Sequence, residues 1–325
     1  FQIGTAETYD VIVEPGSAEA YAIVGESMDR SGMALAMLAS RPGARATVPA
    51  LRDPPLLTMG DMGMDHGSGG MDHSAMGHGS MTKAAPAADA GVAAVDHAAM
   101  GHNAPTTGAE AVDHAAMGHG APADNVAGAA TGAISMDGMN MRDTSLLPPD
   151  VKVGPGVDMV SMSPVDKTGD PGLGLRDVPH RVLNYRMLAA LEPNKDTREP
   201  SRLLELHLTG NMERYMWSFD GRMYSAVSDV PIRFAWNERV RVKLINNTMM
   251  AHPIHLHGMF FELVNGQMPA QQPRKNVVIV QPGASATFDL TANEPGDWAF
   301  HCHLMYHMHG GMMQTVTVMG PKGGA

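Results

Sequence analysis

The sequence predicts an all-β fold that is interrupted by a long segment without regular structure. From about Leu175 to Met319, short runs rich in β-branched and aromatic residues alternate with turns that contain Gly and Pro. This pattern is typical of a β-sandwich or barrel. Residues 59–141, in contrast, hold no aromatic residue and only five Val or Ile. We therefore divide the chain into residues 1–57, 58–150, 151–174 and 175–325.

Residues 1–57 are predicted to be the end of a preceding β-domain. Residues 9–13 and 21–24 are strand-like, and a Glu14-Pro15-Gly16 turn lies between them. About forty residues are too few to bury a core of their own. The sequence opens on Phe1, and no charged and apolar signal segment comes before this region. We therefore expect a C-terminal remnant of a second domain.

Residues 58–150 are predicted to be a disordered, copper-binding linker, followed by a plain linker at 151–174. Between Met59 and Met141 there are eleven methionines, seven histidines and nine acidic residues against Lys83 alone. So little apolar area cannot offset the backbone entropy lost on ordering. An Asp-His-x-x-Met-Gly-His pattern recurs at 72–78, 96–102 and 113–119.

Thioethers favour cuprous ions, and imidazoles bind either oxidation state of copper. We interpret the linker as a flexible copper-collecting arm, with an inert spacer as the alternative. Its candidate copper ligands are His66, Met71, His73, Met76, His78, His97, Met100, His102, His114, Met117 and His119.

The formal net charge is −11, and the linker carries most of it. Carboxylates attract copper ions and repel nucleic acid, so nucleic-acid binding is excluded as a function class. No membrane span is expected either. The single cysteine leaves no internal disulfide to indicate an oxidising compartment.

Residues 175–325 are predicted to form one all-β domain of ordinary size. The predicted strands cover residues 203–208, 239–245, 254–264, 276–280, 286–290, 298–303 and 314–318, with turns at 220–221, 282–283 and 295–296. Residues 181–191 fit either a strand or a helix.

The segment His301-Cys302-His303, followed by His307 and Met312, predicts two metal sites on one strand. Successive side chains of a strand point to opposite faces, so Cys302 faces away from both flanking histidines. A thiolate, an imidazole and a weak axial thioether suit an electron-transferring copper.

A second run, His252, His255 and His257, obeys the same alternation. We assign His252 to the Cys302 site, and His255 and His257 to the site of His301 and His303. Zinc is the competing metal, but structural zinc sites prefer paired cysteines, and this chain has one. Copper fits better.

Over residues 252–258 and 301–312 the chain resembles the multicopper oxidases. The resemblance implies a cupredoxin-like Greek-key β-sandwich and a type 1 copper held by His252, Cys302, His307 and Met312. It also implies His255 as a type 2 ligand, and His257, His301 and His303 as type 3 ligands of a trinuclear, oxygen-reducing cluster. Electrons would pass from the type 1 copper through Cys302 to His301 and His303.

The full pattern of the family needs four more histidines and up to four copper ions in the complete protein. We expect a missing N-terminal cupredoxin domain to supply these histidines, which leaves this chain with half of the cluster ligands. Residues 57–64, 174–177, 217–221 and 248–253 resemble the periplasmic copper resistance protein A branch. That branch implies a bacterial periplasmic oxidase that takes electrons from Cu(I) and reduces dioxygen to water. The alternatives are a copper-sequestering protein and a laccase that oxidises phenols.

Other residues near the motif are interpreted as structural. Met305, Met308 and Met313 are expected in the core or around the copper site, since methionine fills irregular gaps. Trp298 and Tyr306 are expected to be core aromatics.

Overall fold

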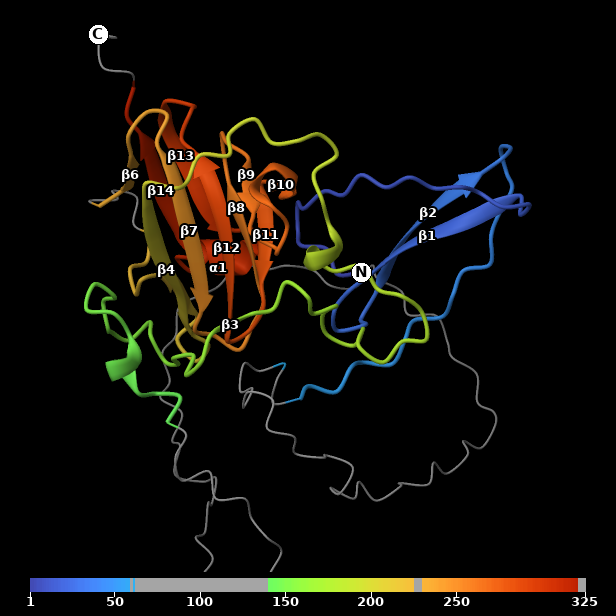
Figure 1. Cartoon of the computed structure of the whole chain (residues 1–325). Coiled ribbons are helices and arrows are strands. Elements are labelled where there is room, and N and C mark those ends of the chain that lie inside the picture. The colour runs from blue at the N-terminus through green and yellow to red at the C-terminus, as the bar shows by residue number, and fades with distance from the viewer. Residues whose placement is uncertain (59–60, 62–139, 225–229, 321–325) are drawn as a thin grey trace, which may run out of the picture. The chain divides into compact units, whose positions relative to one another are not determined.

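The computed structural model describes residues 1–58, 61, 140–224 and 230–320. Residues 165–318 contribute the strands of two sheets that pack face to face (Figure 1). The first sheet contains, in spatial order, β10 (Arg274–Lys275), β9 (Phe261–Leu263), β12 (Ala284–Thr291), β7 (Arg239–Asn246), β4 (Arg202–Asn211) and β5 (Met216–Phe219). The short strand β3 (Val165–Asp166) also pairs with β12. The second sheet contains β11 (Val277–Val280), β8 (His252–Leu256), β13 (Gly296–Cys302), β14 (Met313–Val318) and β6 (Ile232–Phe234).

The core lies between the two sheets, because each strand turns alternate side chains toward it. In β14, Gln314, Val316 and Val318 are buried, and the residues between them are only partly covered. Phe261 of β9 and Phe288 of β12 stack with ring centroids 4.1 Å apart. Each buried side chain of this size contributes about 1.5–3 kcal/mol. This packing holds β8 and β13, the strands that carry the histidines.

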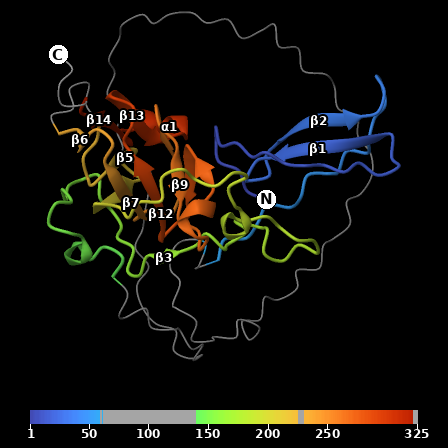
Figure 2. The same cartoon turned by 45° about the horizontal axis from the view of Figure 1, so that its top comes forward.

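Helices are short. The one-turn helix α1 (Met305–His309) follows β13 and lies beside β13 and β5 (Figure 2). Three 3-10 turns, η4 (Thr144–Leu146), η5 (Tyr185–Met187) and η6 (Pro269–Gln271), lie in the connections. None of the helices in the described part of the chain has the length and apolar character needed to cross a bilayer.

The predicted all-β, cupredoxin-like sandwich is confirmed. Each strand range predicted between residues 203 and 318 contains a strand. The predicted strand 254–264, however, is two strands, β8 and β9, which lie in different sheets. Gly258 between them has a φ of +75°, and a Cβ at this position would collide with the Trp298 ring. Glycine adopts this left-handed backbone without a steric cost, so the chain can turn there from one sheet to the other.

The N-terminal prediction is partly wrong. Residues 20–39 form the antiparallel hairpin of β1 (Ala20–Glu26) and β2 (Met33–Ala39), which includes the predicted run 21–24. Residues 9–13 are not a strand, and residues 11–13 are exposed. Residues 181–191, which the sequence left open, contain only the turn η5.

Most of the predicted copper-collecting arm lies outside the described residues, and all eleven of its candidate copper ligands do so. Its disorder and its copper binding therefore stay predictions. The proposed boundaries at residues 57, 150 and 174 also stay predictions.

A buried ion pair attaches the N-terminal residues to the sandwich. Lys275 Nζ lies 2.7 Å from Glu7 Oε1, and the two side chains are 6% and 1% exposed. The Tyr185 hydroxyl donates to the same carboxylate oxygen at 2.9 Å and accepts the N–H of Ile279 at 3.0 Å. The ammonium also lies 3.6 Å from the centroid of the Tyr9 ring, which is a cation–π contact. Burial lowers the pKa of Lys275, so its charge depends on the Glu7 carboxylate.

Replacing Glu7 by Gln should lower the free energy of unfolding by about 3–5 kcal/mol, because the ammonium would remain buried without its counter-charge. Urea denaturation measures this loss. The matched control is Glu19→Gln, which breaks the Arg41–Glu19 pair, in which both side chains are 64% exposed. Exposed pairs contribute little, so the control should match the wild type. Equal losses in both variants would contradict the assigned role of the buried pair.

Asp220 lies in the predicted turn at residues 220–221 and is held by backbone contacts. Its carboxylate accepts the N–H of His207 at 2.7 Å, and its own N–H donates to the His207 carbonyl at 2.8 Å. Burial raises the pKa of Asp220 from 3.8 to about 6. Since the folded state binds this proton more tightly than the unfolded state, stability falls as the pH rises from about 4 to above 6.

Asp220→Asn should therefore stabilise the protein at pH 8 by about 1–3 kcal/mol, and by much less at pH 4. Asn keeps an acceptor oxygen and tolerates the φ of +50° at this position. Denaturation curves of both proteins at the two pH values measure the difference. A gain of the same size at both pH values would show that ionisation is not its cause.

Candidate metal centre

The alternation of side chains along β13 separates Cys302 from its two histidine neighbours. β13 is paired on both sides, with His301 opposite His255 of β8 and opposite Met313 of β14. Cys302 belongs to the core between the sheets and is completely buried. The side chain of His301 meets the histidines of the other face, as does that of His303 just beyond the strand end. One short segment therefore serves two groups of ligating side chains.

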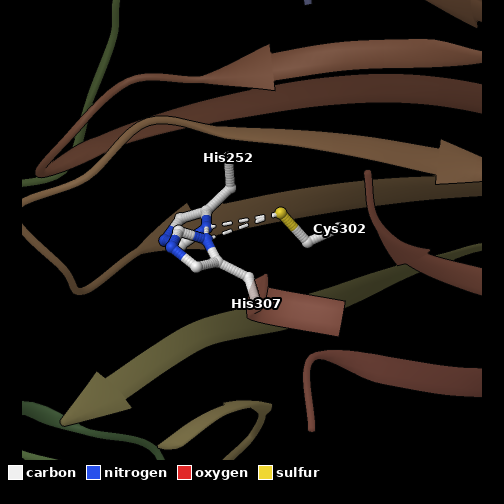
Figure 3. Close-up of side chains that lie close together, drawn as sticks. All are labelled: His252, Cys302 and His307. Atoms are coloured by element: carbon white, nitrogen blue, oxygen red, sulfur yellow. Dashed lines mark hydrogen bonds between the residues drawn. The ribbon is translucent and has the colours of Figure 1, made fainter. Parts of the chain in front are cut away.

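The first group contains His252, Cys302 and His307. Cys302 Sγ lies 3.6 Å from His252 Nδ1 and 3.7 Å from His307 Nδ1, and the two Nδ1 atoms are 3.0 Å apart. Figure 3 shows both imidazoles turned toward the sulfur, with His307 coming from α1. Met312 is also fully buried, and its carbonyl accepts the N–H of Cys302 at 3.1 Å.

A hydrogen-bonded chain sets the tautomer of His252. The two hydrogens of the Asn246 amide nitrogen are shared among three backbone carbonyls, those of residues 250, 280 and 281. The amide oxygen is therefore free to accept from the Thr248 hydroxyl at 2.9 Å. That hydroxyl has one proton, so it accepts from His252 Nε2, which lies 2.7 Å away. The neutral ring then keeps a lone pair on Nδ1, which faces Cys302.

Burial controls the charge of this group. It lowers the pKa of His252 well below its usual value and that of His307 to about 4. It also raises the pKa of the Cys302 thiol to about 12. Neutral imidazoles are the ligating form, and a bound cation would stabilise the thiolate. Two imidazoles and a thiolate form a donor set that fits copper.

The second group contains four histidines. Ring nitrogens of His255, His257 and His301 lie within 4.8 Å of one another. The Nε2 atoms of His257 and His301 are 3.1 Å apart. The centroid of the His303 ring lies 5.5 Å from that of His255 and 5.4 Å from that of His301.

Backbone carbonyls set the tautomers of two of these rings. His255 Nδ1 donates to the Asn276 carbonyl at 2.7 Å, and His301 Nδ1 donates to the Cys302 carbonyl at 2.9 Å. Because a carbonyl only accepts, both Nδ1 atoms are protonated and each neutral ring keeps a lone pair on Nε2. Burial lowers the pKa of both histidines and so favours the neutral form.

His303 supplies a test of whether a metal fits here. Its Nδ1 is buried and has no hydrogen-bond partner among the described residues. A buried polar atom without a partner is costly, and coordination to a metal would satisfy it. Together with the lone pairs on the neighbouring rings, this orphan nitrogen fits a copper-binding group.

Residues 197–321 match the family model described as multicopper oxidase. This segment is therefore similar to a multicopper oxidase domain. Copper resistance protein A from Escherichia coli is 44% identical over 324 residues, which are 98% of this chain and 49% of that protein. Copper resistance protein A from Pseudomonas syringae pv. tomato is 47% identical over 317 residues, again 98% of this chain and 49% of that protein. The chain thus spans about half the length of the curated relatives it matches.

Among solved structures, the McoA multicopper oxidase from the hyperthermophile Aquifex aeolicus is similar at 21% identity and a TM-score of 0.34. The similarity covers 40% of this chain and 31% of that chain.

The structure brings together the side chains that the sequence predicted as copper ligands. His252, Cys302 and His307 form one group, and His255, His257, His301 and His303 form the other. Their division into type 1, type 2 and type 3 ligands stays a prediction, as does the axial role of Met312.

Sequence reasoning missed the residues that orient these ligands. A hydroxyl four residues before His252 could have pointed to Thr248, but nothing in the sequence signalled Trp217, which stacks on His307 from β5. Tyr306 is 73% exposed, so the expectation of a core aromatic was wrong. Met305 is 54% exposed, which excludes the core for this residue. Both lie on the outer side of α1, whose His307 faces the core.

Thr248→Val should destabilise the protein by about 1–3 kcal/mol, because His252 Nε2 would stay buried without its partner. Nitrogen NMR of the His252 ring should show that Nε2–H is no longer the single tautomer. Thr248→Ser keeps the hydroxyl and is the matched control, with stability and tautomer close to the wild type. An unchanged tautomer in the Val variant would mean that Thr248 does not orient the ring.

Proposed function

We propose that this chain is part of a copper-resistance multicopper oxidase that takes electrons from cuprous ions and reduces dioxygen to water. The observation that carries the proposal is the position of Cys302 and its two neighbours, which join the two groups of ligating side chains within three consecutive residues. The similarity to proteins named copper resistance protein A supports the biological role.

The proposed ligands of the type 1 copper are His252, Cys302, His307 and Met312. His255 is the proposed type 2 ligand, and His257, His301 and His303 are the proposed type 3 ligands. Copper bound at these positions would supply one-electron transfer at the first group and dioxygen reduction at the second.

The residues of the chain shield the first group from water, orient the histidine rings and connect the two groups. Burial of the Cys302 group excludes water and keeps both imidazoles neutral. Thr248 and the carbonyl of Asn276 orient one histidine in each group. A single peptide unit separates Cys302 from either neighbouring histidine, so the backbone itself connects the two groups.

Cuprous ion is the proposed substrate, since soft, exposed thioethers lie on α1, the helix of His307, and in the turn that holds Tyr215. Met305 on α1 and Met212 in the β4–β5 turn are both more than half exposed. Each cuprous ion gives one electron, and dioxygen takes up four electrons and four protons to form two waters. We also propose a periplasmic location, and a cluster completed by histidines outside residues 1–325.

Loading this chain with copper should produce an intense blue absorption from the thiolate–copper bond, with the matching narrow paramagnetic signal. Cys302→Ser should remove the blue band, whereas His255→Ala should keep it, because the two residues belong to different groups. Copper content, optical and paramagnetic spectra and circular dichroism are measured on all three proteins. A folded wild type without the band, or a band that survives in Cys302→Ser, would refute the proposed copper site.

A further inference from the structure

The Cys302 group has no ligating side chain at the surface. Cys302, His252 and Met312 are completely buried, and His307 is 4% exposed. A donor in solvent therefore cannot touch a ligand directly, and its electron has to cross other side chains.

A series of aromatic rings extends from the His307 ring toward the surface. Trp217 of β5 stacks on the His307 ring with centroids 4.3 Å apart and planes 20° apart. Tyr215 packs edge-on against Trp217 at 4.6 Å, and Tyr306 lies 6.4 Å beyond Tyr215. Trp217 is buried, whereas Tyr215 is 53% and Tyr306 is 73% exposed. Continuous ring contacts thus run from the buried imidazole to solvent.

The other imidazole of the group has no such route. His252 Nε2 faces the Thr248 hydroxyl, which is tied to Asn246. Among the aromatic pairs of the described residues, the His252 ring contacts only His307. His307 is therefore the ring through which the surface is reached.

The backbone at Tyr215 is strained. Tyr215 has a φ of +53° in the turn between β4 and β5, where its N–H donates to the Met212 carbonyl. Glycine, asparagine and aspartate ordinarily occupy such left-handed positions, and a bulky aromatic residue is an outlier there. Strain of this kind persists where the surroundings enforce it, and it clusters at functional sites. Here the strained position places the Tyr215 ring against the Trp217 ring.

We propose that Tyr215, Trp217 and His307 form the electron-entry path to the Cys302 group, with the donor docking against Tyr215 and Tyr306. This inference rests on the proposed function, which supplies the copper at the end of the path. The donor is a cuprous complex, which the exposed thioethers of Met212 and Met305 suit.

The transfer moves one electron and no proton. The cuprous donor is oxidised to the cupric state, and the copper at Cys302 is reduced by one electron. The rings act as a bridge and keep their own protons. Consistent with this, Trp217 Nε1 is buried and has no hydrogen-bond partner among the described residues, so no acceptor stands ready for the indole proton.

The decisive variant is Tyr215→Asn, because Asn suits the left-handed backbone and removes the ring. The copper-loaded chain is mixed without oxygen with a cuprous acetonitrile complex, and bleaching of the blue band is followed by stopped flow. Bleaching should slow several-fold. The optical and paramagnetic spectra and the midpoint potential should stay unchanged, and the thermal unfolding temperature should be unchanged or higher.

Two further variants sharpen the test. Tyr215→Phe keeps the ring and should bleach at the wild-type rate, since the hydroxyl proton takes no part. Tyr21→Asn makes the same change in the β1–β2 hairpin and should also leave the rate unchanged.

Tyr215→Asn that bleaches at the wild-type rate with an intact blue band would overturn the path and leave the proposed function standing. A Phe variant as slow as the Asn variant would overturn the proton-free bridge. A wild type that never develops the band would instead refute the proposed function.

Discussion

The strict alternation of side chains along β13 is the constraint on which both ligand groups depend. Cys302 belongs to the core, and His301 and His303 belong to the opposite face, because neighbouring residues of a strand cannot share a side. Pairing with β8 and β14 fixes this register through His255 and Met313. A slip by one residue would place the thiol among the histidines of the opposite face and an imidazole in the core. The hydrophobic packing of the sandwich therefore also keeps the two groups distinct.

Burial and hydrogen bonding act together on the ligands. Desolvation favours neutral rings in both groups, but it does not determine which nitrogen holds the proton. That choice is made by nearby acceptors, which are the Thr248 hydroxyl for His252 and backbone carbonyls for His255 and His301. The free nitrogen is Nδ1 in His252 of the core group, and Nε2 in His255 and His301 of the other face. Each lone pair thus points into its own group.

The sequence predicted which side chains would share each group, because both groups depend on local spacing. In a strand, that spacing determines the face to which each side chain points. It did not predict that the chain turns from β8 to β9 at Gly258, because the Trp298 ring that leaves no room for a Cβ there is distant in the sequence. It also did not predict that Trp217 stacks on the His307 ring. Trp217 comes from β5, and its backbone N–H donates to the carbonyl of Gly310, almost a hundred residues along the chain. The exposure of Tyr306 depends on the direction of a one-turn helix that is too short to show a periodic pattern.

The N-terminal residues connect to the histidine cluster through one strand. Glu7 holds Lys275 in a buried pair, and the next residue is Asn276, whose carbonyl accepts from both His255 Nδ1 and the N–H of Leu256. A displacement of β10 would move this carbonyl and with it the hydrogen bond that sets the His255 tautomer. The attachment of residues 1–9 thus stabilises the same segment that orients a proposed copper ligand. Packing between distant parts of the chain and the chemistry of the ligand are linked here through a single backbone carbonyl.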